Sequence, residues 1–219
     1  MVRPVHPGRL PLRLAGAALL VPLLLAAPAP GLGAGEAREG VTAAAASLEA
    51  LRAWPGRWVG RPVRLTLQFQ GRVERWNPFH TRFGPADWVG FTAWPDERFV
   101  WEEEVFADPA PRLFVRRDGP VAAALGGAAL LDRFSALVVV REIFLGEPWI
   151  EILALEPLAE HVPEGSVLHV ERALRFRTQG EPLLAIDQLE RARAAPLPPH
   201  ARAEIDRLIG ECAAAAPDR

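Results

Sequence analysis

The sequence predicts a mainly β protein with helices: a five-stranded β-barrel with one helix between its third and fourth strands, followed by a C-terminal α-hairpin. Three observations carry this prediction. Residues 61–70 alternate between apolar and polar side chains. Residues 136–157 form two apolar runs around a Gly-containing turn. Residues 182–212 carry apolar side chains at helical spacing. An open α+β sheet built from the same elements is the alternative.

Residues 1–35 have the composition of a secretory signal peptide. Arg3, Arg9 and Arg13 precede an apolar run at 14–27, which is too short to span a bilayer, and small residues follow it. We therefore expect a Sec-type signal peptide and a periplasmic or secreted protein. No Cys lies near the cleavage region, so a lipoprotein anchor is not expected. An N-terminal anchor in the inner membrane is the alternative.

Composition narrows the class of protein further. The chain has 219 residues, half of them hydrophobic, which fits a folded core. Loss of the signal peptide removes three Arg and no acidic residue, so the formal net charge changes from −2 to −5. A mildly acidic protein is a poor match for a binder of phosphate backbones or membrane surfaces. The single Cys excludes an internal disulfide and a multi-cysteine metal site.

The N-terminal half is expected to contain one helix and three strands. Residues 36–53 are Ala-rich with a helical period, and Pro55-Gly56 ends them. The strand at 61–70 follows, with Gly71 as a point where it bends. Prolines and turn residues then separate the remaining segments. These are a loop at 77–85, a strand at 87–94, a segment at 99–106 that fits strand and helix equally, and a short strand at 112–116.

The C-terminal half supplies the remaining elements. Residues 120–131 predict a helix weakened by Gly126-Gly127. The β-branched run at 136–145 and its partner at 148–157 predict a hairpin. Residues 166–177 fit a sixth strand or a linking helix, and Pro182 begins the helical hairpin. The predicted organisation is a signal peptide at 1–35, a lead-in helix at 36–56, a barrel domain at 57–178 and a helical hairpin at 179–216.

Three segments resemble parts of known folds. The hairpin REIFLGEPWIEILALEPL at 141–158 and the strand GRPVRLTLQFQG at 60–71 are similar to the last two strands and the first strand of bacterial OB-fold domains. The resemblance implies an OB-like barrel with a ligand face on its second and third strands and nearby loops. GEPLLAIDQLERARAAPLP at 180–198 resembles a tetratricopeptide-like helix pair. One such pair cannot form a solenoid, so we expect it to cap an open end of the barrel.

No motif of a known enzyme class is present, and no two His have the spacing of metal ligands. We therefore expect no cofactor and no metal site. Glu102, Glu103 and Glu104 form the densest charged run, and pairing with Arg such as Arg98 and Arg112 is the favoured interpretation. Cys212 lies on the apolar stripe of the last helix and is expected to be a core residue.

The aromatic residues give the candidate ligand site. All seven Trp lie between Trp54 and Trp149, and several cluster with Arg around the loop between the first two strands. Aromatic rings beside Arg can stack on sugars, bases or peptides. The other interpretation, which we favour for most of the Trp residues, is that these rings plug the barrel and cap its ends. The predicted ligand-binding residues are Trp76, His80, Arg82, Trp88, Trp94, Trp101 and Arg116.

These observations favour a non-enzymatic binding protein of the bacterial envelope, whose ligand is a peptide, a glycan or a partner protein. No stable membrane span is expected after the signal peptide is removed. One alternative is an OB domain that binds single-stranded nucleic acid. The negative net charge and the expected export of the protein argue against this alternative. Another is an enzyme with a carboxylate site at Glu102–Glu104 or with His80 as a catalytic group.

Overall fold

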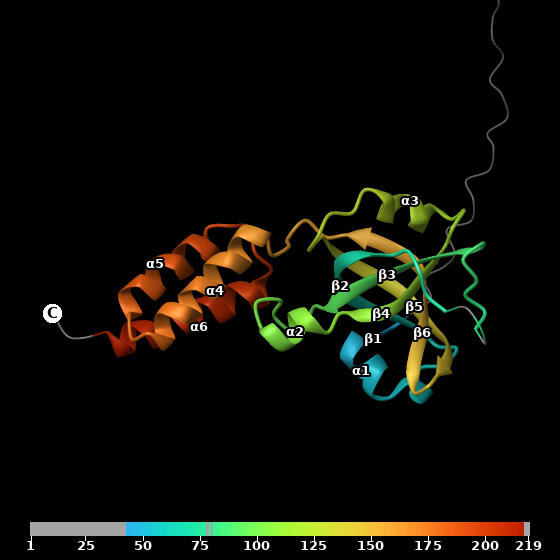
Figure 1. The fold of residues 1–219 in the computed structure, drawn as a ribbon, viewed down its shortest axis with the longest axis horizontal. Coiled ribbons are helices and arrows are strands. Elements are labelled where there is room, and N and C mark those ends of the chain that lie inside the picture. Colours follow the sequence, from blue (N-terminus) through green and yellow to red (C-terminus); the bar gives the residue numbers. More distant parts are fainter. Residues whose placement is uncertain (1–42, 78, 80, 217–219) are drawn as a thin grey trace, which may run out of the picture. The chain divides into compact units, whose positions relative to one another are not determined.

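The computed structural model describes residues 43–77, 79 and 81–216, so the predicted signal peptide lies outside the described residues. Five strands form a closed barrel (Figure 1): β2 (Pro62–Val73), β3 (Trp88–Pro95), β4 (Ala110–Arg116), β5 (Arg133–Phe144) and β6 (Glu147–Pro157). Their order around the barrel is β2-β3-β4-β6-β5, and β5 pairs with β2. Helix α3 (Pro120–Gly126) connects the third strand to the fourth. The predicted fold class is confirmed, and the open-sheet alternative is wrong.

Strand β2 closes the barrel because it pairs with different neighbours along its length. Its first part pairs antiparallel with β5, from Pro62 to Gln68, and its second part pairs antiparallel with β3, from Leu67 to Val73. The register shifts between Phe69 and Gly71, where the sequence predicts a bend. Only β4 and β6 pair in parallel among the barrel strands.

The segment before the barrel differs from its prediction. Residues Ala44–Ala45 form a short strand, β1, parallel to β2, so the predicted helix over 36–53 is wrong there. Helix α1 covers only Leu48–Ala53 and begins where the Ser47 hydroxyl accepts a hydrogen bond from the amide of Ala50. The first part of the predicted helix, residues 36–42, lies outside the described residues. A 3₁₀ turn at Pro55–Arg57 follows.

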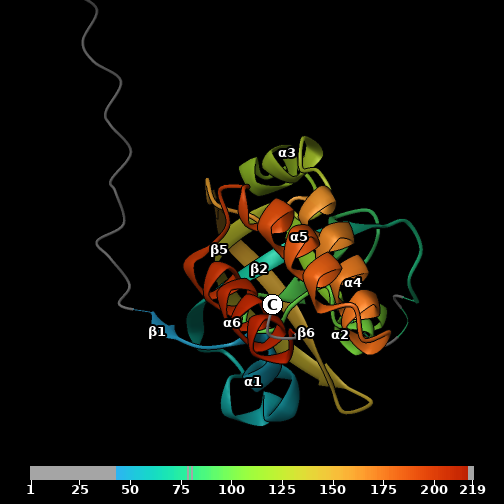
Figure 2. The same ribbon diagram turned by 90° about the vertical axis from the view of Figure 1, so that its left-hand side faces the viewer.

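The barrel interior is filled by the inward side chains of all five strands. Helices α1 and α3 lie on opposite sides of the barrel in both views (Figure 2), and each adds leucines to the interior cluster, namely Leu48, Leu51 and Leu125. No fully buried Trp belongs to this cluster, and only Trp58 packs against it, half-buried. The expectation that the Trp rings plug the barrel is therefore wrong for the described residues.

Three helices follow the barrel: α4 (Glu164–Thr178), α5 (Pro182–Arg193) and α6 (Pro199–Ala215). The last two form the predicted hairpin. Residues 166–177, where strand and helix were both possible, belong to α4. The three helices share a second core with Trp94 and Trp101, and Cys212 is buried in it as expected. The described part of the barrel interior contains no residue of α4–α6. That the hairpin caps an open end of the barrel stays a prediction.

Helix α2 (Glu103–Ala107) lies between β3 and β4. The segment 99–106, which fitted strand and helix equally, is thus a turn followed by a short helix. Val105 is the buried residue of α2, and it joins the second core together with Val100 and Trp101. The turn and helix therefore link the barrel to the C-terminal helices.

Candidate functional site

The predicted ligand-binding residues separate into two groups. Trp76, Arg82, Trp88 and Arg116 lie on or beside the β2–β3 loop and the outer surface of β3 and β4. Trp94 and Trp101 instead are buried in the second core, among the C-terminal helices. His80 lies outside the described residues. The structure therefore does not gather the seven residues into one surface.

An outer aromatic cluster covers β3, β4 and β6 on the side away from the barrel interior. It consists of Phe83, Trp88, Phe114 and Trp149, all buried, with Trp76 and Phe144 packed against them. Phe83 comes from the β2–β3 loop and is 0% exposed. Its ring centre lies 4.3 Å from that of Phe114 and 4.7 Å from that of Trp88. The loop thus covers the strand face on which an OB-like barrel would hold a ligand.

Hydrogen bonds hold this loop against the barrel. The Trp76 indole N–H donates to the carbonyl oxygen of Phe83 at 2.7 Å. The Arg117 guanidinium donates to the carbonyl oxygens of Pro85 and Trp88. Gly90 lets the Trp76 ring approach, because a Cβ at this glycine would meet the ring at 3.3 Å. Trp88 is consequently a packing residue of the loop, and it is not exposed to solvent.

One end of the outer aromatic cluster is open and forms a groove of about 370 Å³, here called the aromatic groove. The β2–β3 loop, the start of β4 and the β5–β6 hairpin provide its walls. Its lining residues are Val73, Arg75, Trp76, Asn77, Pro111, Arg112, Phe114, Phe144, Leu145 and Trp149. Of the predicted site residues that the structure describes, only Trp76 lines this groove. An apolar floor with a few polar groups is typical of ligand sites.

Leu145 at the hairpin turn is an unusual residue for its position. Its φ is 52° and that of Gly146 is 81°, a pair of left-handed residues that suits Asn-Gly better than Leu-Gly. The Leu145 side chain is also 84% exposed. Both its backbone strain and its apolar exposure are unfavourable for stability. Such features are concentrated at binding sites, where a side chain must be presented.

Two arginines provide the positive charge of the aromatic groove. Arg112 forms an ion pair with Glu147 at 3.2 Å, and its guanidinium lies 5.9 Å from the centre of the Trp149 ring. Arg75 is exposed and has no ion-pair partner among the described residues. The predicted Arg116 lies outside the groove, with its guanidinium 4.1 Å from the centre of the Trp88 ring. A free cation therefore stands at the groove edge.

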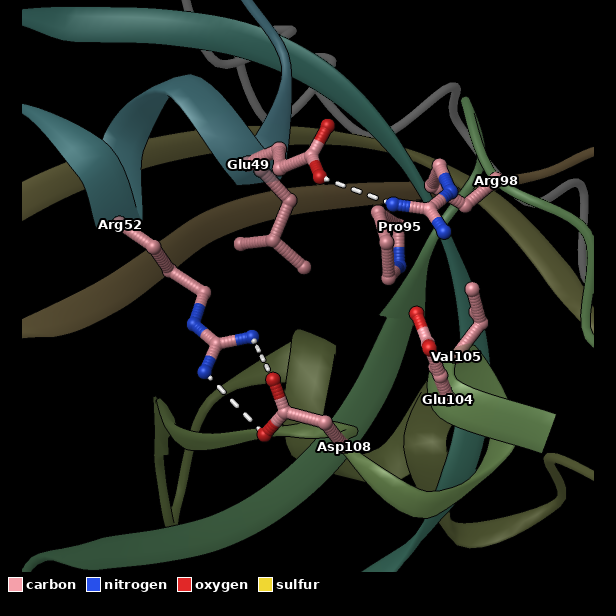
Figure 3. Close-up of a pocket in the computed structure, with 8 residues that line it drawn as sticks. Glu49, Arg52, Pro95, Arg98, Glu104, Val105 and Asp108 are labelled. Atoms are coloured by element: carbon pink, nitrogen blue, oxygen red, sulfur yellow. Dashed lines mark hydrogen bonds and ion pairs between the residues drawn. The ribbon is translucent and has the colours of Figure 1, made fainter. Parts of the chain in front are cut away.

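The acidic run does not form a carboxylate pair. Glu102 binds Arg98 at 2.8 Å, as predicted, whereas Arg112 binds Glu147 instead. Glu104 points into a pocket of about 200 Å³ between α1 and α2 (Figure 3), and Glu103 lines a different groove. In the α1–α2 pocket, Arg52 binds Asp108 and Arg98 binds Glu49. These two ion pairs neutralise four of its charged side chains, and Glu104 has no ion-pair partner among the described residues.

The described residues hold no group of three or more His, Cys, Asp or Glu that could bind a metal ion. Ser166 and His169, close in sequence, have separate partners: the Ser166 hydroxyl donates to the Ala192 carbonyl, and His169 hydrogen-bonds Gln188. Burial raises the pKa of the Cys212 thiol, which opposes a nucleophilic role.

No family model, curated protein or solved structure that was compared with the chain matches it.

Sequence reasoning missed most of the aromatic groove. Arg75, Arg112 and Phe144 belong to three separate elements, and the sequence gives no direct sign that these elements meet. One signal was available in β6. Residues 148–152 are apolar apart from Glu151, and the structure buries all five. A strand that is apolar on both faces must be covered on its outer face as well.

Proposed function

We propose that this protein is a non-enzymatic binding module that holds a peptide segment of a partner in the aromatic groove. One observation carries the proposal: aromatic rings form the floor of an open groove, and the unpaired Arg75 stands at its edge. The left-handed, exposed Leu145 supports it, because this residue presents an apolar side chain at the same groove.

The chemistry of the groove selects among the possible ligands. Among its described lining residues, Asn77 carries the only side-chain amide and none carries a hydroxyl, so the groove offers few uncharged hydrogen-bonding groups to a glycan. Rings such as Trp76 and Phe144 favour a planar apolar side chain, and Arg75 favours a carboxylate next to it. A peptide with an aromatic residue beside an acidic residue fits best.

The fold gives this proposal a structural context. We infer that the barrel is an OB-like barrel whose ligand site lies at the β2–β3 loop and the β5–β6 hairpin, as the strand order supports. The α5–α6 pair, by the same inference, is a tetratricopeptide-like addition. Binding of single-stranded nucleic acid is a weaker candidate, because the expected mature charge of −5 opposes phosphate binding.

We further propose that the protein acts outside the cytoplasm, in the periplasm or after secretion. The Arg-rich start and apolar run of residues 1–35 support this. No helix in the described part of the chain is long and apolar enough to cross a membrane. N-terminal sequencing of protein recovered from the periplasm or medium tests the proposal. A mature N-terminus at Val2 contradicts it.

Peptide binding is tested with a displayed library of random dodecapeptides. We expect the full chain to enrich peptides that combine an aromatic residue with Asp or Glu. The Arg75→Glu variant should lose this enrichment, whereas the control Arg57→Glu, an exposed Arg outside the groove, should keep it.

A second pair of variants tests the aromatic floor. Trp76→Ala should weaken an enriched peptide at least about tenfold, a loss of about 1.4 kcal/mol. The control Trp54→Ala removes a ring that is 66% exposed and lies outside the groove. Equal peptide affinities in the two variants contradict the proposal. If the protein binds a glycan array more strongly than peptides, the ligand is a glycan. If it binds an oligonucleotide more strongly, with a steep dependence on salt, the ligand is a single-stranded nucleic acid.

A further inference from the structure

A second groove lies between α2 and α4 and shares no lining residue with the aromatic groove. Its cavity volume is about 470 Å³. Val100, Trp101, Glu102, Glu103, Phe106, Glu171, Leu174 and Arg175 line it. The groove, here called the α2–α4 groove, therefore combines an apolar floor with several carboxylates.

The apolar floor is fixed by ring stacking. Trp101 stacks on Phe99 with ring centres 4.7 Å apart, and Phe99 stacks on His200 of α6 at 5.9 Å. Phe106 stacks on the buried Trp94 at 5.4 Å, yet its side chain remains 53% exposed. A large ring held in place while half of it faces solvent is characteristic of a contact surface.

The charges of the groove are unbalanced. Glu102 is bound to Arg98, while Glu103, Glu171 and Arg175 have no ion-pair partner among the described residues. Two free carboxylates therefore face one free guanidinium. The groove complements a ligand that carries positive charge and apolar surface together, and it opposes anionic lipid headgroups and phosphate backbones.

We propose that the α2–α4 groove docks a basic, amphipathic peptide segment of a partner protein. The aliphatic stem of an Arg or Lys side chain lies on Phe106 and Leu174, and its charged end reaches Glu103 or Glu171. A neighbouring aliphatic side chain of the segment covers Trp101. This site binds peptides of charge opposite to those proposed for the aromatic groove, and it does not depend on that groove.

The test uses the full chain, a displayed library of random dodecapeptides and the double variant Glu103→Gln/Glu171→Gln. The Gln side chains keep the size of the groove walls and remove their charge. Glu164→Gln is the matched control, since Glu164 is an exposed glutamate of α4 outside the groove. The wild-type chain should enrich peptides with Arg or Lys beside Leu, Ile or Val.

An enriched peptide, labelled with fluorescein, is then titrated with each variant. We expect the double variant to bind about five- to tenfold more weakly, the control to match the wild type, and salt to weaken binding. Phe106→Ala should also weaken it, and circular dichroism confirms that each variant is folded.

Three results overturn the proposal: no basic peptides are enriched, the double variant binds like the wild type, or the enriched basic peptides lose binding only in Arg75→Glu. Because the two grooves select peptides of opposite charge in the same library, failure of one does not imply failure of the other.

Discussion

Replacing Phe83 with Ala tests whether the β2–β3 loop is packed as part of the fold. The Phe83 ring is fully buried and contacts Trp88, Phe114 and Trp149, with ring centres 4.3 to 5.8 Å away. Buried Phe→Ala replacements destabilise proteins by about 3–5 kcal/mol. A surface loop can relax partly into the space, so we expect about 3 kcal/mol for Phe83→Ala.

Urea unfolding followed by Trp fluorescence measures this loss. All seven Trp lie between Trp54 and Trp149, so the signal reports on the barrel and the segments attached to it. With a denaturant dependence of about 2 kcal/mol/M, the midpoint should fall by about 1.5 M. The control is Phe79→Ala in the same loop, whose ring is 73% exposed and which should change stability by less than about 0.5 kcal/mol. If both variants lose less than about 1 kcal/mol, Phe83 does not anchor the loop.

Three further predictions concern single side chains. Arg133→Met should lower the free energy of unfolding in urea by about 3–5 kcal/mol, because buried Asp96 then lacks its two hydrogen bonds of 2.6 and 2.7 Å from Arg133. The control Arg191→Met breaks an exposed ion pair and should lower it by less than about 1 kcal/mol, so equal losses in the two variants contradict this reasoning. Leu145→Asn should raise the free energy of unfolding by up to about 1 kcal/mol, because Asn adopts the left-handed turn with less strain, and it should weaken peptide binding. A lower midpoint of thermal unfolding would contradict the expected gain in stability. Burial raises the pKa of the Cys212 thiol, so at pH 8 less of it is thiolate in the native protein than in the urea-unfolded chain. The native protein should therefore react with a disulfide reagent far more slowly, and equal reaction rates would refute the burial of Cys212.

The sequence predicted the strands well because local patterns determine them. The alternation at 61–70 appears as inward side chains of β2, and the Leu145-Gly146 turn joins β5 to β6. The region at 166–177 was ambiguous because Val167 and Val170 suit a strand as well as a helix, and packing on α5 decides for the helix. Residues 44–45 form a strand despite their Ala content because β2 offers a partner, which no local pattern reveals.

The candidate site was much less predictable. Trp94 is one of a run of aromatic residues near the β2–β3 loop in sequence, but it points to the C-terminal helices, which begin about seventy residues later. Trp76 was identified because it stands beside this loop. Arg75 stands next to it and has no distinguishing feature in the sequence. Only the meeting of three distant elements makes these residues neighbours.

The double pairing of β2 has a consequence for the order in which the chain folds. Pro62 pairs with Val139 and Gln68 with Arg133, so the barrel cannot close until β5 has been synthesised, whereas α4, α5 and α6 form from neighbours in sequence. Closure must bring together segments separated by a long, flexible intervening chain, and contacts of this kind slow folding. The first half of β2 therefore presents an unpaired edge to other chains until β5 has been synthesised, and Arg64 places charge on that edge in the meantime.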